Sequence, residues 1–112
     1  MMTSNLISAK VSTFKPSGYV SAANASSFEQ QLKDAIVSQD YSVFLVDMSG
    51  VEFLDSAGLM ALVSACRLVQ TIGKRFSLCS IPPSVRIVFE LTGLDSVFEI
   101  FGSSSAFEAS FD

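Results

Sequence analysis

The residue types that could support chemistry in this sequence meet at Asp55 and Ser56. The apolar run 43–46 precedes this pair, and apolar residues at three- and four-residue spacing follow it as far as Gly73. The pattern predicts a buried strand, a short polar loop and then the first turn of a helix. Free amides at a helix N-terminus favour a negative charge. Ser56 therefore has two interpretations: an N-cap whose hydroxyl accepts a hydrogen bond from an amide one turn on, or a hydroxyl that is modified or bound by a partner.

The chain contains no histidine, which removes most of the chemistry that a serine or a cysteine could do. A Ser-His-Asp or Cys-His nucleophile pair, a histidine base and a histidine metal ligand are all excluded. No lysine lies near Ser56 in the sequence to act as a base, and the Gly-x-Ser-x-Gly elbow is absent. Cys66 and Cys79 lie in apolar runs and are expected to be reduced core residues. We therefore predict a protein that is not an enzyme, with no catalytic residue, metal or cofactor.

The composition predicts a single folded domain over residues 1–112. Hydrophobic residues make up 49% of the chain and charged residues 16%, which disfavours disorder. The net charge of −4 argues against nucleic acid or an anionic membrane surface as the main partner. No apolar run approaches the ~20 residues that span a bilayer, and no signal segment opens the chain. These features predict a cytoplasmic location.

Hydrophobic periodicity predicts elements in the order ββαβαβαβα. The first two strands, 5–14 and 19–21, flank the turn Lys15-Pro16-Ser17-Gly18 and resemble a hairpin. The apolar run inside 41–48 is typical of a central strand covered on both faces. The strand 75–80, reached through a helix, is expected to lie parallel to it. The last strand covers 97–101, and the helices begin near Asn24 or Ser26, at Ser56, at Pro83 and at 103–105. The expected fold class is α/β: one mixed sheet of four or five strands, packed by about four helices.

The helix after Asp55 leaves one narrow polar stripe between two apolar faces. Projection at about 100° per residue places on it Ser56, Met60, Ser64, Arg67 and Thr71. Met60 is the apolar exception. Methionine is common at surfaces that accept partners, and the alternative is a core residue at the edge of the stripe.

The motif Phe53-Leu54-Asp55-Ser56-Ala57-Gly58-Leu59, taken with the element order, resembles the STAS domain. This family joins sulphate transporters to the anti-sigma factor antagonists of bacteria. Further matches in register are Gly18-Tyr19-Val20 with Asn24-Ala25, Asp47-Met48-Ser49, Ile72-Gly73, and Val85, Phe89 and Thr92-Gly93-Leu94. The resemblance covers nearly the whole chain and implies a single STAS-like domain that acts by binding partners.

The resemblance implies an anti-sigma factor antagonist in a partner switch. In such antagonists an ATP-dependent anti-sigma factor serine kinase phosphorylates the serine of Asp-Ser-x-Gly, the unphosphorylated form binds that kinase, and a phosphatase resets the system. Carried to this chain, the phosphorylation site is Ser56. Ser21 stands where the family's loop aspartate would fall, which leaves one polar contact open. Ala57 removes a neighbouring hydroxyl that many members carry. The partner-binding residues implied by the motif, its loop and the polar stripe are Ser21, Asn24, Asp55, Ala57, Gly58, Met60, Ser64 and Arg67.

Phosphorylation of Ser56 would add about −1.5 to −2 charges. The positive end of the helix would receive them, so the helix is expected to gain about 0.3–1 kcal/mol rather than unfold. Asp47, Glu52 and Asp55 lie close in sequence, so the phosphate would deepen a negative patch and displace a partner. Gly58, without a side chain, would let a partner's backbone approach. The alternative is a STAS module that does not switch, such as a subunit of a transporter or of a sensory complex, in which Ser56 is only a cap.

Overall fold

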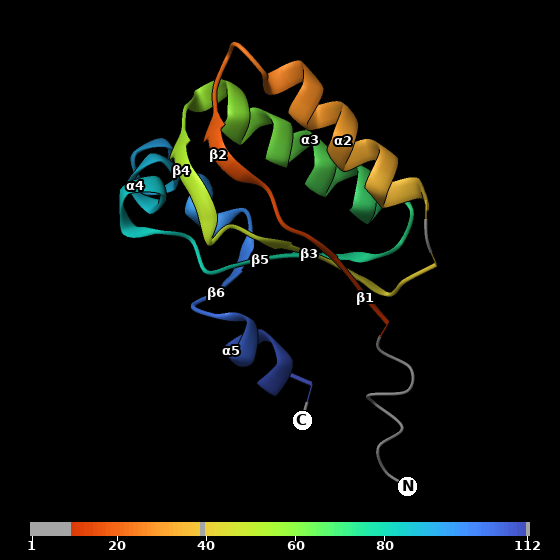
Figure 1. Cartoon of the computed structure of the whole chain (residues 1–112). Helices are drawn as coiled ribbons and strands as arrows, with labels where there is room; N and C mark the ends of the chain where they lie inside the picture. Colours follow the sequence, from red (N-terminus) through yellow and green to blue (C-terminus); the bar gives the residue numbers. More distant parts are fainter. Residues whose placement is uncertain (1–9, 39, 112) are drawn as a thin grey trace, which may run out of the picture.

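Four parallel strands form the main sheet of the computed structural model, which describes residues 10–38 and 40–111. In spatial order they are β1 (Val11–Phe14), β3 (Val43–Asp47), β5 (Arg75–Cys79) and β6 (Glu99–Phe101). The helices α2 (Ala25–Ser38) and α3 (Ser56–Thr71) lie on one side of this sheet, and the short helix α5 (Ser104–Ala109) lies on the other (Figure 1). The remaining elements are β2 (Ser17–Val20), β4 (Gly50–Leu54), α4 (Pro83–Thr92) and the 3-10 turn η1 (Leu94–Ser96). The expected α/β class with about four helices is confirmed.

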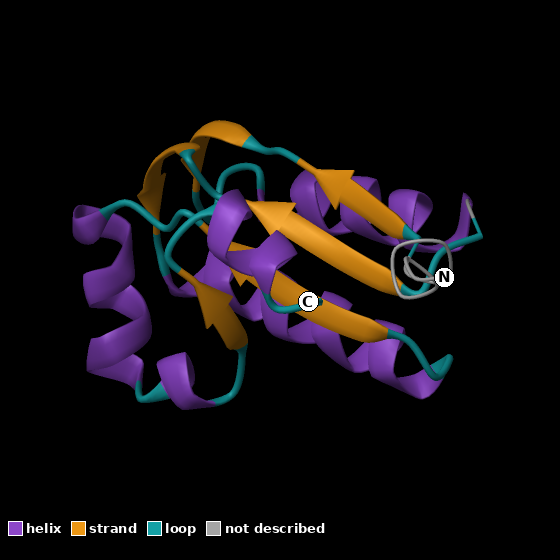
Figure 2. Ribbon diagram, turned by 90° about the horizontal axis from the view of Figure 1, so that it is seen from below, coloured by secondary structure: helices purple, strands orange, loops and turns teal. Residues whose placement is uncertain are grey.

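Strand β3 is covered on both faces, as its unbroken apolar run predicts. Phe44 and Val46 belong to the main buried cluster, which also contains residues of α2 and α3. Val43 and Leu45 belong to a second, smaller cluster, in which they meet Phe107 of α5. Successive side chains of a strand point to opposite faces, so one strand supplies both cores. Figure 2, seen from the side of the smaller cluster, shows the helix nearest the C-terminus lying across the strands.

The connection from β3 to β5 follows the expected crossover. The two strands pair in parallel from Val43 opposite Arg75 to Asp47 opposite Cys79. Parallel neighbours need a long connection, and part of it here is α3, whose buried face packs into the main core. The predicted parallel pair is confirmed.

The predicted hairpin between the first two strands is wrong. β1 pairs in parallel with β3, and β2 pairs in parallel with β4. The chain runs from β1 into β2 without reversing (Figure 1). Between them Pro16 has no amide hydrogen to give to a ladder, so the turn signal marks a step from one sheet to the next. Every pairing among the described strands is parallel, and the mixed sheet expected from the hairpin is not formed by them; residues 5–9 of the predicted first strand lie outside the described residues.

Residues 50–54 form the strand β4 where the sequence analysis expected a loop. A shift in its register with β2 makes Glu52 an extra residue, a β-bulge. Glu52 and Phe53 are consequently both exposed, whereas Val51 and Leu54 are both buried. The bulge hides the two-residue period by which a strand is recognised. The observed order of strands and α-helices is therefore ββαββαβαβα.

Both cysteines are core residues, as expected. Cys66 lies on α3 and Cys79 ends β5, and both are free thiols and buried. Burial raises the pKa of each thiol, which disfavours the reactive thiolate. Their role is packing.

Candidate functional site

Asp55 is the N-cap of α3 and ties that helix to the loop after β2. Its Oδ1 accepts a 3.0 Å hydrogen bond from the amide of Gly58, and its Oδ2 accepts a 2.9 Å bond from the amide of Ala22. The amide of Asp55 itself donates to the carbonyl of Val20 at 3.2 Å. The Gly58 amide, and after it the Ala22 amide, hold the pKa of the Asp55 carboxyl below its usual range. The carboxylate is therefore ionised at neutral pH, with both of its oxygens engaged by backbone amides.

Ser56 is the first helical residue of α3, so its interpretation as the N-cap is wrong. Asp55 has the extended dihedral angles of a cap, φ −103° and ψ −175°, and the helical conformation begins after it. The Ser56 side chain is exposed. Across residues 10–38 and 40–111 its hydroxyl makes no hydrogen bond to another side chain or to the backbone. The hydroxyl therefore lies open to solvent at the end of a helix that favours an anion.

The loop from Ser21 to Asn24 is held in shape by its own polar groups. The Asn24 Oδ1 accepts a 2.8 Å bond from the Ser21 amide, and its Nδ2 donates to the Tyr19 carbonyl at 2.8 Å. The Ser21 hydroxyl accepts a 3.4 Å bond from the Ala23 amide. The Ala22 amide of this loop donates to the Asp55 carboxylate, so the structure brings the loop beside Asp55, as the site prediction requires. The Asn24 side chain is committed to the loop rather than to a helix cap.

Gly58 is buried where the first turn of α3 packs against β2. A Cβ at this position would lie 2.7 Å from the Leu54 Cδ1 and 3.0 Å from the Val20 carbonyl oxygen. The missing side chain of Gly58 thus makes room for the backbone of Val20 in this chain, and not for the backbone of a partner. Ala57, the next predicted contact, is half-buried.

The polar stripe of α3 contains residues of two kinds. Met60 is 51% exposed, which supports its interpretation as a surface residue rather than a core residue. Arg67 is exposed and has no ion pair within the described part of the chain. Ser64 differs, because it is partly buried and its hydroxyl donates a 3.2 Å hydrogen bond to the Glu29 carboxylate of α2. We call Ser56, Met60 and Arg67 the Ser56 surface, and Ser64 is a link between two helices.

Sequence reasoning missed an exposed aromatic pair on the strands that lead into the site. Tyr19 of β2 is 66% exposed and Phe53 of β4 is 45% exposed. Their rings are stacked, with 5.8 Å between centroids and 26° between planes. Phe53 owes its outward position to the bulge at Glu52, which no feature of the sequence announces. Aromatic side chains of this kind are frequent anchors in protein interfaces.

The site offers an exposed hydroxyl beside a fixed carboxylate. Both Asp55 oxygens accept bonds from amides, so this carboxylate is not directed at the Ser56 hydroxyl as a base. Among the described residues, no group of three or more His, Cys, Asp and Glu is placed to hold a metal ion. None of the helices in the same residues is both long enough and apolar enough to cross a membrane. An exposed Ser56 hydroxyl at the start of a helix is suited to bind a partner and to accept a phosphoryl group.

Comparison with known families gives the same result as the motif. The model of the STAS domain matches residues 5–106, which is most of the chain. The chain belongs to the STAS domain family. This STAS domain is 31% identical over 94 residues to BtrV of Bordetella bronchiseptica, which is named as an anti-sigma factor antagonist. The match covers 84% of this chain and 80% of that protein.

Solved structures of STAS relatives share the fold. An anti-sigma factor antagonist of Mycobacterium paratuberculosis superposes with a TM-score of 0.75 at 31% identity, over 92% of this chain and 87% of that chain. A protein of Thermotoga maritima, described as an anti-sigma factor antagonist, gives a TM-score of 0.77 at 28% identity, over 88% and 86% of the two chains. The expected family, the STAS domain of the anti-sigma factor antagonist type, is therefore confirmed.

Proposed function

We propose that this STAS domain binds an anti-sigma factor that is an ATP-dependent serine kinase, and that it does so through the Ser56 surface. Phosphorylation of Ser56 by that kinase ends the binding, and a phosphatase restores it. The observation that carries the proposal is the exposed Ser56 hydroxyl, which makes no hydrogen bond within the described residues and lies at the start of a helix. The class of partner is supported by relatives that are named as anti-sigma factor antagonists.

A phosphate on Ser56 would change the surface and leave the fold intact. It adds about −1.5 to −2 charges beside the ionised Asp55 carboxylate, on a chain whose net charge is already −4. The helix N-terminus stabilises this charge by about 0.3–1 kcal/mol. Because the cap is Asp55, modification of Ser56 breaks no hydrogen bond of α3. The result is repulsion and steric exclusion of a partner that needs close contact at this turn.

The same geometry bears on a STAS module that does not switch. Such a module would retain a serine at position 56 as a helix cap. Asp55 already supplies that cap, with its Oδ1 3.0 Å from the Gly58 amide. The presence of a hydroxyl at position 56 is therefore not explained by helix capping, and this supports the switching function.

The test compares Ser56→Asp with Ser84→Asp. Ser84 is also exposed and is the second residue of a helix, α4, so both changes add one charge to an exposed position in the first turn of a helix. The tagged parent is used to isolate its kinase from native cells, and the purified kinase is then titrated against each variant. We expect the parent and Ser84→Asp to bind alike, and Ser56→Asp to bind at least about tenfold more weakly, because charge and bulk block the contact.

Two further measurements complete this test. With Mg-ATP, mass spectrometry should place one phosphate on Ser56 in the parent and none on Ser56→Ala. The thermal melt of Ser56→Asp should stay close to that of the parent. Equal binding by Ser56→Asp and the parent, or phosphate on another residue, would contradict the proposal.

A further inference from the structure

Side chains of α5, β1 and β3 line a groove. Helix α5 lies on the face of the main sheet opposite α2 and α3 (Figure 1). The volume of the groove is about 320 Å³, which is in the range of sites that hold a small ligand or a few side chains. Much of its wall is apolar, from Val11, Leu45, Phe107 and Phe111. Val11 is 39% exposed, although valine is among the residues most often buried. The groove is thus an apolar surface that the described chain leaves open.

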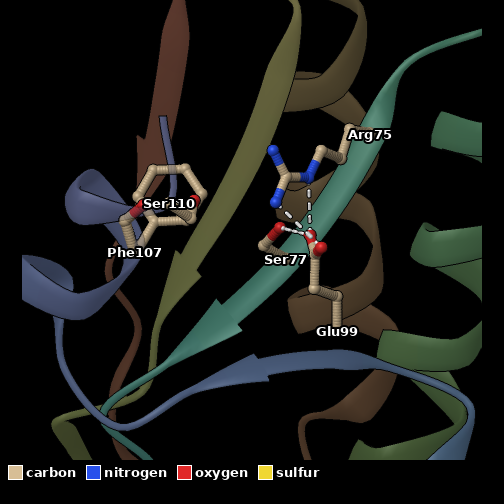
Figure 3. A network of polar contacts seen from close by, with 5 residues as sticks. All are labelled: Arg75, Ser77, Glu99, Phe107 and Ser110. Atoms are coloured by element: carbon tan, nitrogen blue, oxygen red, sulfur yellow. Dashed lines mark hydrogen bonds and ion pairs between the residues drawn. The ribbon is translucent and has the colours of Figure 1, made fainter. Parts of the chain in front are cut away.

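The wall that α5 contributes is anchored through Arg75. The Arg75 guanidinium lies over the rings of Phe107 and Phe111, at 5.9 and 5.4 Å from their centroids. Its Nε and Nη2 donate hydrogen bonds of 2.6 and 2.8 Å to the two carboxylate oxygens of Glu99, and the Ser77 hydroxyl donates to the same carboxylate (Figure 3). The charge of Arg75 is therefore balanced by Glu99. Arg75 packs against two of the rings that line the groove and is not itself among the side chains that line it.

Two carboxylates line the groove without a positive partner. Asp47 ends β3 and Glu108 lies on α5, and neither forms an ion pair with another described residue. One oxygen of Asp47 accepts a 3.0 Å bond from the Ser49 amide. The other polar side chains at the groove, Thr13 and Ser104, are neutral hydroxyls. An apolar groove with two negative charges is complementary to an apolar group that carries a positive charge.

We propose that this groove is a second docking surface, which takes a short segment of a partner protein in which Leu or Phe is flanked by Lys or Arg. The apolar side chain fills the space between Leu45 and Phe111, and the cations pair with Asp47 and Glu108. A second copy of this chain fits less well, because each copy has a net charge of −4. The sheet separates the groove from α3, so a partner here and a partner on the Ser56 surface can bind together. The domain would then join two proteins.

The experiment measures fluorescence anisotropy of a labelled peptide, Lys-Leu-Phe-Lys-Leu-Arg, titrated with the full chain at low salt. The peptide Glu-Leu-Phe-Glu-Leu-Glu is the charge-reversed control. Asp47→Asn with Glu108→Gln should weaken binding roughly tenfold, as two charge pairs are lost, one at a half-buried and one at an exposed carboxylate. The matched control is Asp34→Asn with Glu90→Gln, which also removes one Asp and one Glu charge, but from exposed positions on α2 and α4. Circular dichroism melts show that each variant is folded.

A third variant, Thr13→Lys, blocks the groove from an exposed position on β1. Its ammonium group enters the groove in place of the peptide, so we expect binding to be lost. Ser56→Asp should bind the peptide as the parent does, which separates this proposal from the proposed function. Equal losses in the two double variants would show general charge attraction and overturn the proposal, as would binding that Thr13→Lys leaves unchanged. Failure of the parent to bind also overturns it. Peptide binding only by a variant that starts at Lys10 would mean that residues 1–9 occupy the groove, and this also overturns the proposal. A dimer in sedimentation that Thr13→Lys breaks would mean that a second copy occupies it, with the same consequence.

Discussion

At the scale of single residues, Asp55 caps the helix and its neighbour Ser56 provides the exposed hydroxyl. The carboxylate of Asp55 holds the Gly58 and Ala22 amides, and the hydroxyl of Ser56 is left exposed. If the hydroxyl were the cap, a phosphate on it would remove a hydrogen bond from the helix. With the carboxylate as the cap, position 56 can change its charge while the turn keeps its geometry.

Asp55→Ala is expected to open this turn locally. The amides of Ala22 and Gly58 lose their acceptor, so their hydrogen exchange, followed by NMR, should accelerate to the rate of unprotected loop amides. Amides in the centre of β3 should keep their protection. The control is Glu52→Ala, which removes a nearby exposed carboxylate that does not contact these amides. Unchanged exchange at Ala22 in Asp55→Ala would contradict the role assigned to the carboxylate.

At the scale of elements, the position of α3 depends on how closely its first turn approaches β2. Gly58 allows the contact, because a Cβ there would overlap the Leu54 side chain and press on the Val20 carbonyl. The same strand continues into the loop whose Ala22 amide binds Asp55. The close packing of glycine against β2 and the carboxylate bond therefore position the Ser56 turn together.

Gly58→Ala should destabilise the domain by about 1–3 kcal/mol, the usual cost of overpacking a filled site. The measurement is the free energy of unfolding in urea. Gly102→Ala is the matched control, because a Cβ at that position meets no atom within 4 Å and its cost should stay within about 0.5 kcal/mol. A Gly58→Ala variant as stable as Gly102→Ala would show that the turn has room that the structure does not indicate.

At the scale of the whole molecule, the sheet separates two surfaces that differ in chemistry. The Ser56 surface belongs to α3, on the side of the large core. The groove belongs to the side of the small core, where Phe107 attaches α5 to Val43 and Leu45. Each side contains an ionised carboxylate that holds it together. Asp55 accepts hydrogen bonds from two backbone amides, and Glu99 accepts them from Arg75. Protonation should therefore weaken the whole structure.

The free energy of unfolding should fall as the pH is lowered from about 6 to about 3. The Gly58 amide holds the pKa of Asp55 below its usual range, and the Arg75 hydrogen bond does the same for the pKa of Glu99. Such carboxyls stabilise the fold above their unfolded values of about 3.9 and 4.3, and this stability is lost as the pH falls through the lower folded values.

Urea unfolding across this pH range provides the measurement. Asp55→Asn with Glu99→Gln should be less stable than the parent at neutral pH and should show a flatter dependence on pH. Asp34→Asn with Glu90→Gln should keep the parent's slope. If both double variants follow the parent's curve, these two carboxyls are not the source of the dependence.

The sequence by itself determined the features that depend on local pattern. An unbroken apolar run at Val43–Val46 implied a strand buried on both faces, because each side chain must find an apolar neighbour. Pro83 and Gly93 bounded α4, since proline fits the first turn and Gly93 adopts φ +74° at the end. Residues 53–59, taken with the element order and the further matches in register, indicated the family and singled out Ser56.

Tertiary structure decided which distant segments meet. The partner of β2 is β4, and the bulge at Glu52 that this pairing produces turns Phe53 outward. The carboxylate of Asp55, not the hydroxyl of Ser56, caps α3 and also binds the Ala22 amide, 33 residues away in sequence. Local periodicity does not encode such contacts, because strand pairing and the choice of hydrogen-bond partner depend on the packing of the whole chain.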